Sequence, residues 1–171
     1  HPATGMLMYK GFLDMPARKS YCSPFNDFWC CTGTGMENHA KYNDSIYDRA
    51  GDALYVNLFI ASQLTWLEKG LRLKQVTGFP RQGGSRLEFA LDKPIPMEVR
   101  IRRPFWCAGM KIQVNGSPLE ASPAADGYVK VSRTFTGGDV IEIDLPRTLR
   151  TETMPDNSGR VAFFCGPILL A

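Results

Sequence analysis

From Leu54 onward, apolar residues alternate with polar ones at a period of two. The alternation is clearest at residues 71–74, 87–89, 99–102, 129–131 and 141–145. Because successive side chains of a β-strand point to opposite faces, this period predicts strands that are buried on one face only. The residues that we expect to face a common core are Leu71, Leu73, Phe89, Ile101, Val131, Ile141 and Ile143.

Turn-forming residues separate these strands at hairpin-like intervals of about 8–12 residues. They lie at residues 83–84, 92–96, 115–116, 126–127, 137–139 and 157–159. Both residues of Asn115-Gly116 tolerate positive φ, so this pair predicts a type I′ turn after residues 111–114. The sequence therefore predicts a mainly β fold, an antiparallel, jelly-roll-like β-sandwich over residues 51–153, with residues 154–171 beginning a further β domain.

The first fifty residues have a different pattern. Thr34 followed by Glu37 matches a capping box, which predicts a helix from about residue 35 to residue 48. Gly51 lies where a left-handed residue would close that helix. The segment has too few apolar residues for a core of its own. We therefore expect residues 1–50 to belong to a helical domain whose larger part lies upstream, and the chain to be an excerpt of a longer protein.

Charge and hydropathy argue against two classes of partner. The 20 Lys and Arg against 17 Asp and Glu give a net charge of +3, far from the basic surface of a nucleic-acid-binding protein. Arg100, Arg102 and Arg103 alternate with apolar residues, as on one solvated strand face. The longest apolar run, residues 161–171, is well short of the roughly 20 residues that cross a bilayer. We expect neither a nucleic-acid nor a membrane partner.

The adjacent Cys30 and Cys31 are the residues best suited to take part in chemistry. From the residues alone they could be two small hydrophobic side chains, two metal-binding thiolates, or a nucleophile beside a supporting thiol. Their place just before the expected helix favours the thiolate, because a helix N-terminus is positive. Cys22, Glu37 and His39 have no recognised zinc-ligand spacing to the pair. The odd total of five cysteines disfavours a disulfide framework and leaves the cellular compartment open.

The segment around this pair, FWCCTGTGMENHAKY at residues 28–42, resembles glycoside hydrolase families 127 and 146, the β-L-arabinofuranosidases. Supporting similarity continues through most of the chain, at residues 44–47, 54–60, 100–106, 114–116 and 164–167. The cysteine block is highly specific, and the later segments are supportive.

The resemblance implies an (α/α)6 toroid that carries the active site, followed by β-sandwich domains, with this chain starting in the last toroid helices. It implies a retaining hydrolase for arabinose-containing glycans in which Cys30 is the nucleophile and both Cys30 and Cys31 bind zinc. A glutamate, a third cysteine and the acid/base would come from the upstream toroid, the partner of this chain. Zinc is therefore expected in the intact enzyme and absent or weakly bound here, where the isolated chain would be inactive. Cys22 matches no ligand position.

Two alternatives of other classes stay open. The sandwich could be a carbohydrate-binding module with a stacking platform drawn from Trp66, Phe105, Trp106 and Tyr128. Two exposed coplanar rings would distinguish this alternative. The sandwich could also be a structural module that braces the toroid.

Overall fold

The computed structural model describes residues 1, 3–9, 11, 18–27, 29–120 and 124–170. The chain divides into two compact units, His1–Ser45 and Ile46–Ala171. The division lies slightly before residue 50, where the sequence pattern changes. Each unit is described by itself below.

The described residues of the first unit form the α-helix α1 (Cys30–Lys41), followed by a 3-10 turn, η1 (Tyr42–Ser45). The predicted helix start at Thr34 was wrong. Trp29 is the N-cap residue, and its carbonyl accepts hydrogen bonds from the amides of Thr32 and Gly33 at 3.0 and 3.2 Å. Thr34 lies inside the helix, where its hydroxyl donates to the Cys30 carbonyl at 3.1 Å. Thr34 and Glu37 therefore do not form a capping box, although their residue types match one.

The predicted helix end at residue 48 was also wrong, because the chain turns into a strand at Tyr47. The buried Ile46 precedes this strand, and the Ile46 carbonyl accepts a hydrogen bond from the Asn57 amide at 2.9 Å. Gly51 has the expected positive φ of 57°. It serves the turn between the first two strands rather than the end of the helix.

Few described residues of the first unit are buried. Within those residues, only Cys22 and Thr32 are shielded from solvent. Leu7 approaches α1 closely at Gly35, where an added Cβ would lie 3.1 Å from a Leu7 methyl carbon. The Cys22 amide also donates to the Leu7 carbonyl at 2.8 Å. The glycine therefore lets the N-terminal segment lie against the helix.

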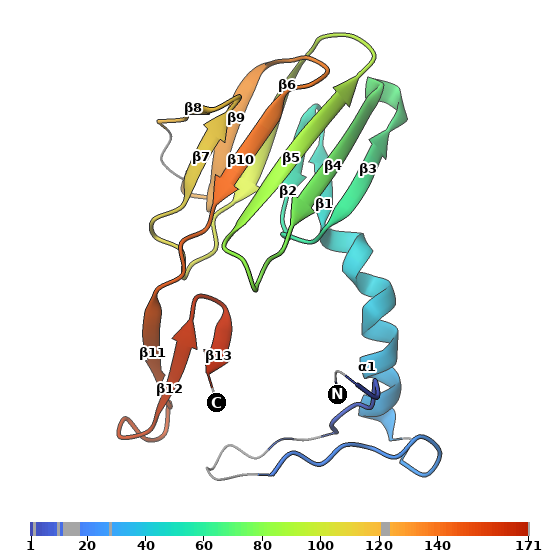
Figure 1. Ribbon diagram of the computed structural model, residues 1–171, viewed down its shortest axis with the longest axis vertical. Helices are drawn as coiled ribbons and strands as arrows, with labels where there is room; N and C mark the ends of the chain where they lie inside the picture. The colour runs from blue at the N-terminus through green and yellow to red at the C-terminus, as the bar shows by residue number, and fades with distance from the viewer. Residues whose placement is uncertain (2, 10, 12–17, 28, 121–123, 171) are drawn as a thin grey trace. The chain divides into compact units, whose positions relative to one another are not determined.

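The second unit is a β-sandwich (Figure 1). Its four-stranded sheet has the order β1 (Tyr47–Ala50), β2 (Ala53–Val56), β6 (Ile95–Arg102) and β9 (Tyr128–Phe135). Its six-stranded sheet has the order β3 (Ser62–Trp66), β4 (Leu71–Thr77), β5 (Gly84–Leu91), β10 (Val140–Asp144), β7 (Lys111–Val114) and β8 (Ser117–Pro118). A 3-10 turn, η2 (Leu67–Lys69), joins β3 to β4. The predicted mainly β sandwich is confirmed.

One strand pair departs from the antiparallel pattern. β2 and β6 pair in parallel, with Val56 opposite Ile101. Parallel neighbours need a crossover connection, and here β3, β4 and β5 of the other sheet lie between them in the chain. The two sheets are thereby linked through the sequence as well as through the core.

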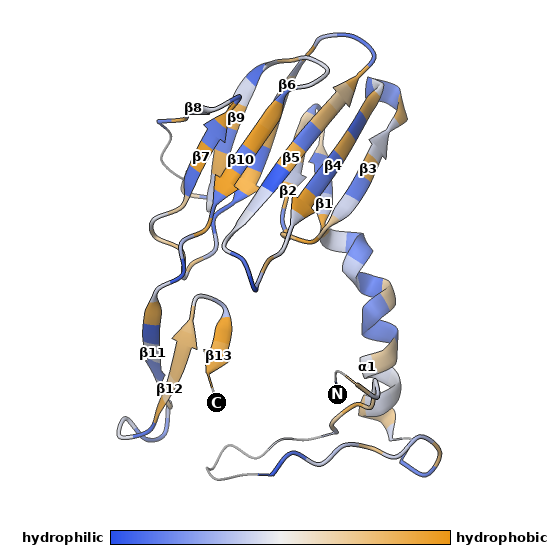
Figure 2. Cartoon of the chain, in the orientation of Figure 1, coloured by the Kyte–Doolittle hydropathy of each residue, from blue (hydrophilic) through white to orange (hydrophobic). Residues whose placement is uncertain are grey.

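The predicted inward face is confirmed. All seven residues that we expected to face the core are at most 3% exposed. They pack with Leu54, Val99 and Phe135, and the Phe135 ring stacks on Phe89 with centroids 4.7 Å apart. Figure 2 shows the alternation of hydrophobic and hydrophilic residues along these strands. The core is therefore built from the inner faces of both sheets.

The Asn115-Gly116 turn is confirmed as well. Asn115 and Gly116 have φ values of 53° and 78°, and the flanking Val114 and Ser117 are paired. Positive φ at both central residues is the geometry of a type I′ hairpin turn.

A separate three-stranded sheet ends the chain, formed by β11 (Leu149–Thr153), β12 (Val161–Cys165) and β13 (Ile168–Leu170). Its first strand begins before residue 154, where the sequence placed a new domain. Leu149 and Phe163 are 77% and 56% exposed on this sheet.

Candidate functional site

Cys30 and Cys31 occupy the first two positions of α1. Both are exposed free thiols, and their sulfur atoms lie 3.7 Å apart. This separation is a thiol contact and not a disulfide, whose sulfurs are about 2.05 Å apart. The first amides of a helix have no partners within the helix and form its positive end, which stabilises thiolates. The pair is therefore accessible and lies in an electropositive position.

Tyr9 interacts with this pair, and no feature of the sequence predicted this role. The Cys31 thiolate, followed by that of Cys30, raises the pKa of the Tyr9 hydroxyl. Its ring also lies 5.0 Å from that of Trp29. No period or motif marks Tyr9 in the sequence, because the contact depends on how residues 3–9 fold back toward the helix.

The two thiols also influence each other. The hydrogen bond and the negative charge of Cys30 raise the pKa of the Cys31 thiol, and the Tyr9 hydroxyl opposes this effect by hydrogen bonding. Both sulfurs are therefore hard to ionise together without a nearby cation. This donor set suits a cation that prefers thiolate ligands.

The geometry of the pair fits zinc. Two sulfurs at tetrahedral angles, each about 2.3 Å from one Zn²⁺, lie about 3.8 Å apart. The separation of 3.7 Å between Cys30 and Cys31 agrees with this value. Within the part of the chain that the structure describes, no three His, Cys, Asp or Glu side chains gather as a metal site. The described residues thus bring together two thiols that could act as metal ligands.

The local candidates for further ligands do not join the pair in such a group. Cys22 is buried, and its sulfur lies 3.6 Å from the Thr32 hydroxyl. The His39 ring packs edge-on against Tyr42 at 5.5 Å. Glu37 is exposed on α1, two turns beyond the pair. Cys22 and His39 therefore each contact another residue of the first unit, Thr32 and Tyr42 respectively.

The four rings considered as a stacking platform do not form one. Trp66 is 7% exposed, and Trp106 stacks on Phe79 with centroids 6.0 Å apart. Phe105 is 78% exposed but lies 5.2 Å from the Arg150 guanidinium. Tyr128 is half-buried. Two exposed coplanar rings are absent from this set of four.

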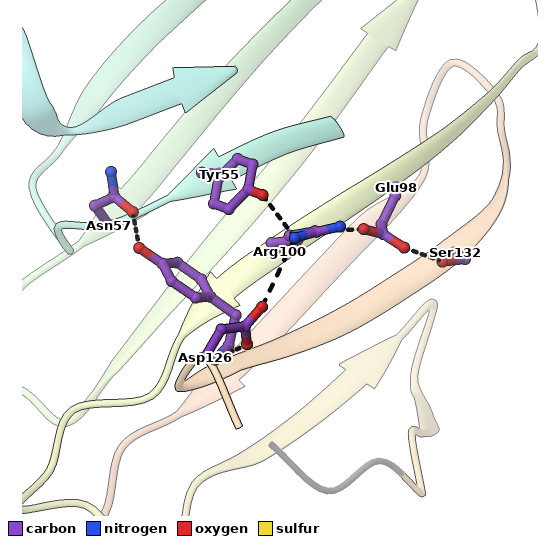
Figure 3. Close-up of polar contacts among 7 residues, drawn as sticks. Tyr55, Asn57, Glu98, Arg100, Asp126 and Ser132 are labelled. Carbon is purple, nitrogen blue, oxygen red and sulfur yellow. Dashed lines mark hydrogen bonds and ion pairs between the residues drawn. The ribbon is translucent and has the colours of Figure 1, made fainter. Parts of the chain in front are cut away.

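Arg100 lies in a polar network on the four-stranded sheet (Figure 3). Its guanidinium donates to the Tyr55 hydroxyl at 2.6 Å and to the Glu98 carboxylate, and it lies 3.7 Å from the Asp126 carboxylate. The hydrogen bond from Arg100 holds the pKa of Glu98 below its ordinary value. Glu98 also accepts a hydrogen bond from Ser132 at 3.1 Å. Two carboxylates therefore balance the charge of Arg100.

No helix in the described residues combines the length and hydropathy needed to span a bilayer.

Comparison with solved structures gives the class of the domain. The structure matches a protein titled "Glycoside hydrolase" with a TM-score of 0.75 and 24% identity, over 92% of this chain and 28% of that one. It also matches a GH127 beta-L-arabinofuranosidase from Geobacillus stearothermophilus T6, with a TM-score of 0.76 and 26% identity over 86% of this chain. A further GH127 beta-arabinofuranosidase matches with a TM-score of 0.72, 26% identity and 82% coverage of this chain. The fold is thus that of a β-sandwich domain found in glycoside hydrolases.

The family follows from the sequence match. The model of the GH127 beta-L-arabinofuranosidase middle domain matches residues 53–147, more than half of the chain. The chain belongs to the GH127 family. It spans about a quarter of the length of each of the two GH127 structures, 25% in both cases. Comparison with curated proteins finds no match.

Proposed function

We propose that this chain is part of a retaining glycoside hydrolase that acts on β-L-arabinofuranosides in arabinose-containing glycans. The observation that carries the proposal is the pair of exposed thiols, 3.7 Å apart at the start of α1, in a chain of the GH127 family. The two GH127 structures that the chain resembles are titled as arabinofuranosidases, which supports the choice of sugar.

In this proposal, the Cys30 sulfur is the nucleophile. It attacks the anomeric carbon, a carbon–sulfur bond forms, and the glycosidic carbon–oxygen bond breaks. A carboxylic acid outside the described residues protonates the leaving oxygen, and its conjugate base then activates water. Water cleaves the carbon–sulfur bond from the opposite face, so the anomeric configuration is retained.

Cys31 has the role of a metal ligand beside the nucleophile. Bound zinc would supply the positive charge that keeps both sulfurs ionised at neutral pH, where a free thiol of pKa about 8.5 is mostly protonated. Tyr9 lowers the pKa of the Cys31 thiol, although the larger effect of Cys30 keeps that pKa above its ordinary value. With two of four ligands among the described residues, we propose that the isolated chain binds zinc weakly and has negligible activity.

The test uses cysteine variants of the longer protein in which this chain follows a helical catalytic domain. Cys30→Ser removes the attacking sulfur and one ligand, so turnover of an aryl arabinofuranoside should be abolished even with excess zinc. Cys31→Ser weakens zinc binding but leaves the nucleophile, so added zinc should partly restore turnover. Cys22→Ser is the matched control, since that thiol is buried against Thr32. Equal behaviour of Cys30→Ser and Cys31→Ser would refute the assigned roles.

A further inference from the structure

A cleft lies at one edge of the sandwich, lined mainly by residues of β1 and β3. β1 is the edge strand of the four-stranded sheet, and β3 is that of the six-stranded sheet. The Tyr47 hydroxyl on β1 and the Ser62 hydroxyl on β3 lie 3.0 Å apart. The cleft beside them has a volume of about 380 Å³, within the range of about 300–1,000 Å³ typical of small-ligand sites. All its lining residues belong to the second unit, whereas the cysteine pair belongs to the first.

The inner part of the cleft is apolar and well ordered by the core. Leu54 and Trp66 line it and are 2% and 7% exposed, and Leu64, which also lines it, is partly buried. A ligand that enters would place an apolar face against Leu64, since Leu54 and Trp66 are almost fully covered. Purely ionic or fully solvated ligands gain nothing from such a surface.

Hydrogen bonding leaves one acceptor at Tyr47 for a ligand. The Ser62 hydroxyl has a single proton, which it donates to the Ile60 carbonyl at 2.8 Å. The Tyr47 hydroxyl must then donate its own proton to Ser62 across their 3.0 Å contact. The Tyr47 oxygen consequently retains a lone pair that can accept a hydrogen bond from a ligand hydroxyl.

Two cations lie at or close to the rim, and each forms an ion pair, while the lining carboxylate of Asp48 accepts a hydrogen bond from the Asn57 side-chain amide at 2.8 Å. Arg49 lies 3.6 Å from Glu68 and 5.7 Å from the Trp66 ring centre. Lys69 pairs with Asp52 and lies 5.8 Å from the same ring centre. The cations are therefore balanced by carboxylates, while their remaining N–H groups can still donate hydrogen bonds. This balance disfavours an anionic ligand and suits a neutral one.

We propose that this cleft binds a neutral sugar ring, with its C–H face on Leu64 and a hydroxyl donating to the Tyr47 oxygen. A sugar has both an apolar face and a polar edge, as the lining of the cleft requires. Binding needs no reaction at Cys30, so the proposal stands independently of the catalytic one.

The experiment is a titration of the ¹⁵N-labelled 171-residue chain with L-arabinose, methyl α-L-arabinofuranoside, D-xylose and D-galactose, followed by NMR. At least one sugar should produce saturable shifts at the Trp66 indole N–H and at the amides of residues 47–49 and 64–66. Tyr47→Phe keeps the ring and removes the acceptor, so it should weaken binding about 2- to 10-fold. Tyr55→Phe is the matched control, because that hydroxyl accepts from Arg100 outside the cleft lining, and it should leave the affinity unchanged.

A second variant keeps the test decisive if Tyr47→Phe disturbs the fold. Arg49→Met preserves the side-chain stem over Trp66 and removes the rim donors, so it should also weaken binding. Absence of saturable shifts with all four sugars, or shifts confined to other parts of the chain, would overturn the proposal. So would unchanged binding by a folded Tyr47→Phe variant. Cys30→Ser should bind as the unmodified chain does, which separates this result from failure of the catalytic proposal.

Discussion

Asp139 connects two turns of the sandwich, and its replacement by asparagine should destabilise the second unit. The carboxylate is 5% exposed. One oxygen accepts from the Asn115 amide at 2.8 Å, and the other accepts from the Thr136 backbone N–H at 2.8 Å. Arg133 lies 3.7 Å away. The side chain therefore joins the β7–β8 turn to the β9–β10 turn.

The expected magnitude follows from these contacts. Asp139→Asn keeps one oxygen acceptor but turns an N–H group toward either Asn115 or Thr136, which both donate. One charge-assisted hydrogen bond is lost and a buried donor is left unpaired, so the cost is about 2–4 kcal/mol. Asp144→Asn, an exposed carboxylate on β10, is the matched control and should change stability by less than about 0.5 kcal/mol.

The effect should depend on pH with a defined sign. Burial raises the pKa of Asp139. Hydrogen bonds from Asn115 and Thr136 and the charge of Arg133 lower it, and together they exceed the effect of burial. The net pKa therefore lies below its ordinary value. A lowered folded-state pKa gives stability that is present above the ordinary value of about 3.9 and is lost as the pH falls through the folded value.

Urea denaturation of both variants at pH 7 and below pH 4 measures this effect. The difference between wild type and Asp139→Asn should be largest at pH 7 and should shrink in acid. A difference at pH 7 no larger than that of Asp144→Asn, or one that does not shrink in acid, would show that the reasoning is wrong.

Two further predictions concern glycines and thiols. Gly166→Ala should lower the melting temperature more than Gly116→Ala, although both glycines have positive φ. The new Cβ would lie 2.8 Å from Arg147 at position 166 and would have no neighbour within 4 Å at position 116. Thermal unfolding followed by circular dichroism measures the two melting temperatures. Iodoacetamide labelling with peptide mapping, in the presence of a chelator, should modify Cys30 and Cys31 well before Cys107, because burial raises the pKa of the Cys107 thiol and leaves it 1% exposed; faster labelling of Cys107 would contradict the structure.

The inward face of the sandwich was predictable because a period of two depends only on neighbouring residues. Leu71 and Leu73 on β4, for example, alternate with charged residues and are each 1% exposed. The parallel pairing of β2 with β6 was not predictable, because it depends on which distant strands become neighbours. The helix start was mispredicted for a related reason. Thr34 and Glu37 are the residue types of a capping box, but the helix begins earlier, because the Trp29 carbonyl accepts its first hydrogen bonds.

The candidate site was predictable where its residues are adjacent in sequence. Cys30 and Cys31 must be close together, although only the structure gives the sulfur separation and the exposure of both thiols. Tyr9 could not be found, because its contact with Cys31 joins two segments that share no motif. The cleft beside Tyr47 was hidden for the same reason, since its two sides come from β1 and β3.

In the proposed reaction, Cys30 carries the covalent glycosyl intermediate. The most direct measurement is peptide mass spectrometry of the longer protein after trapping with a mechanism-based arabinofuranosyl inhibitor. The account predicts one glycosyl adduct on the sulfur of Cys30 and none on Cys31. An adduct on Cys31, or on any residue other than Cys30, would contradict it.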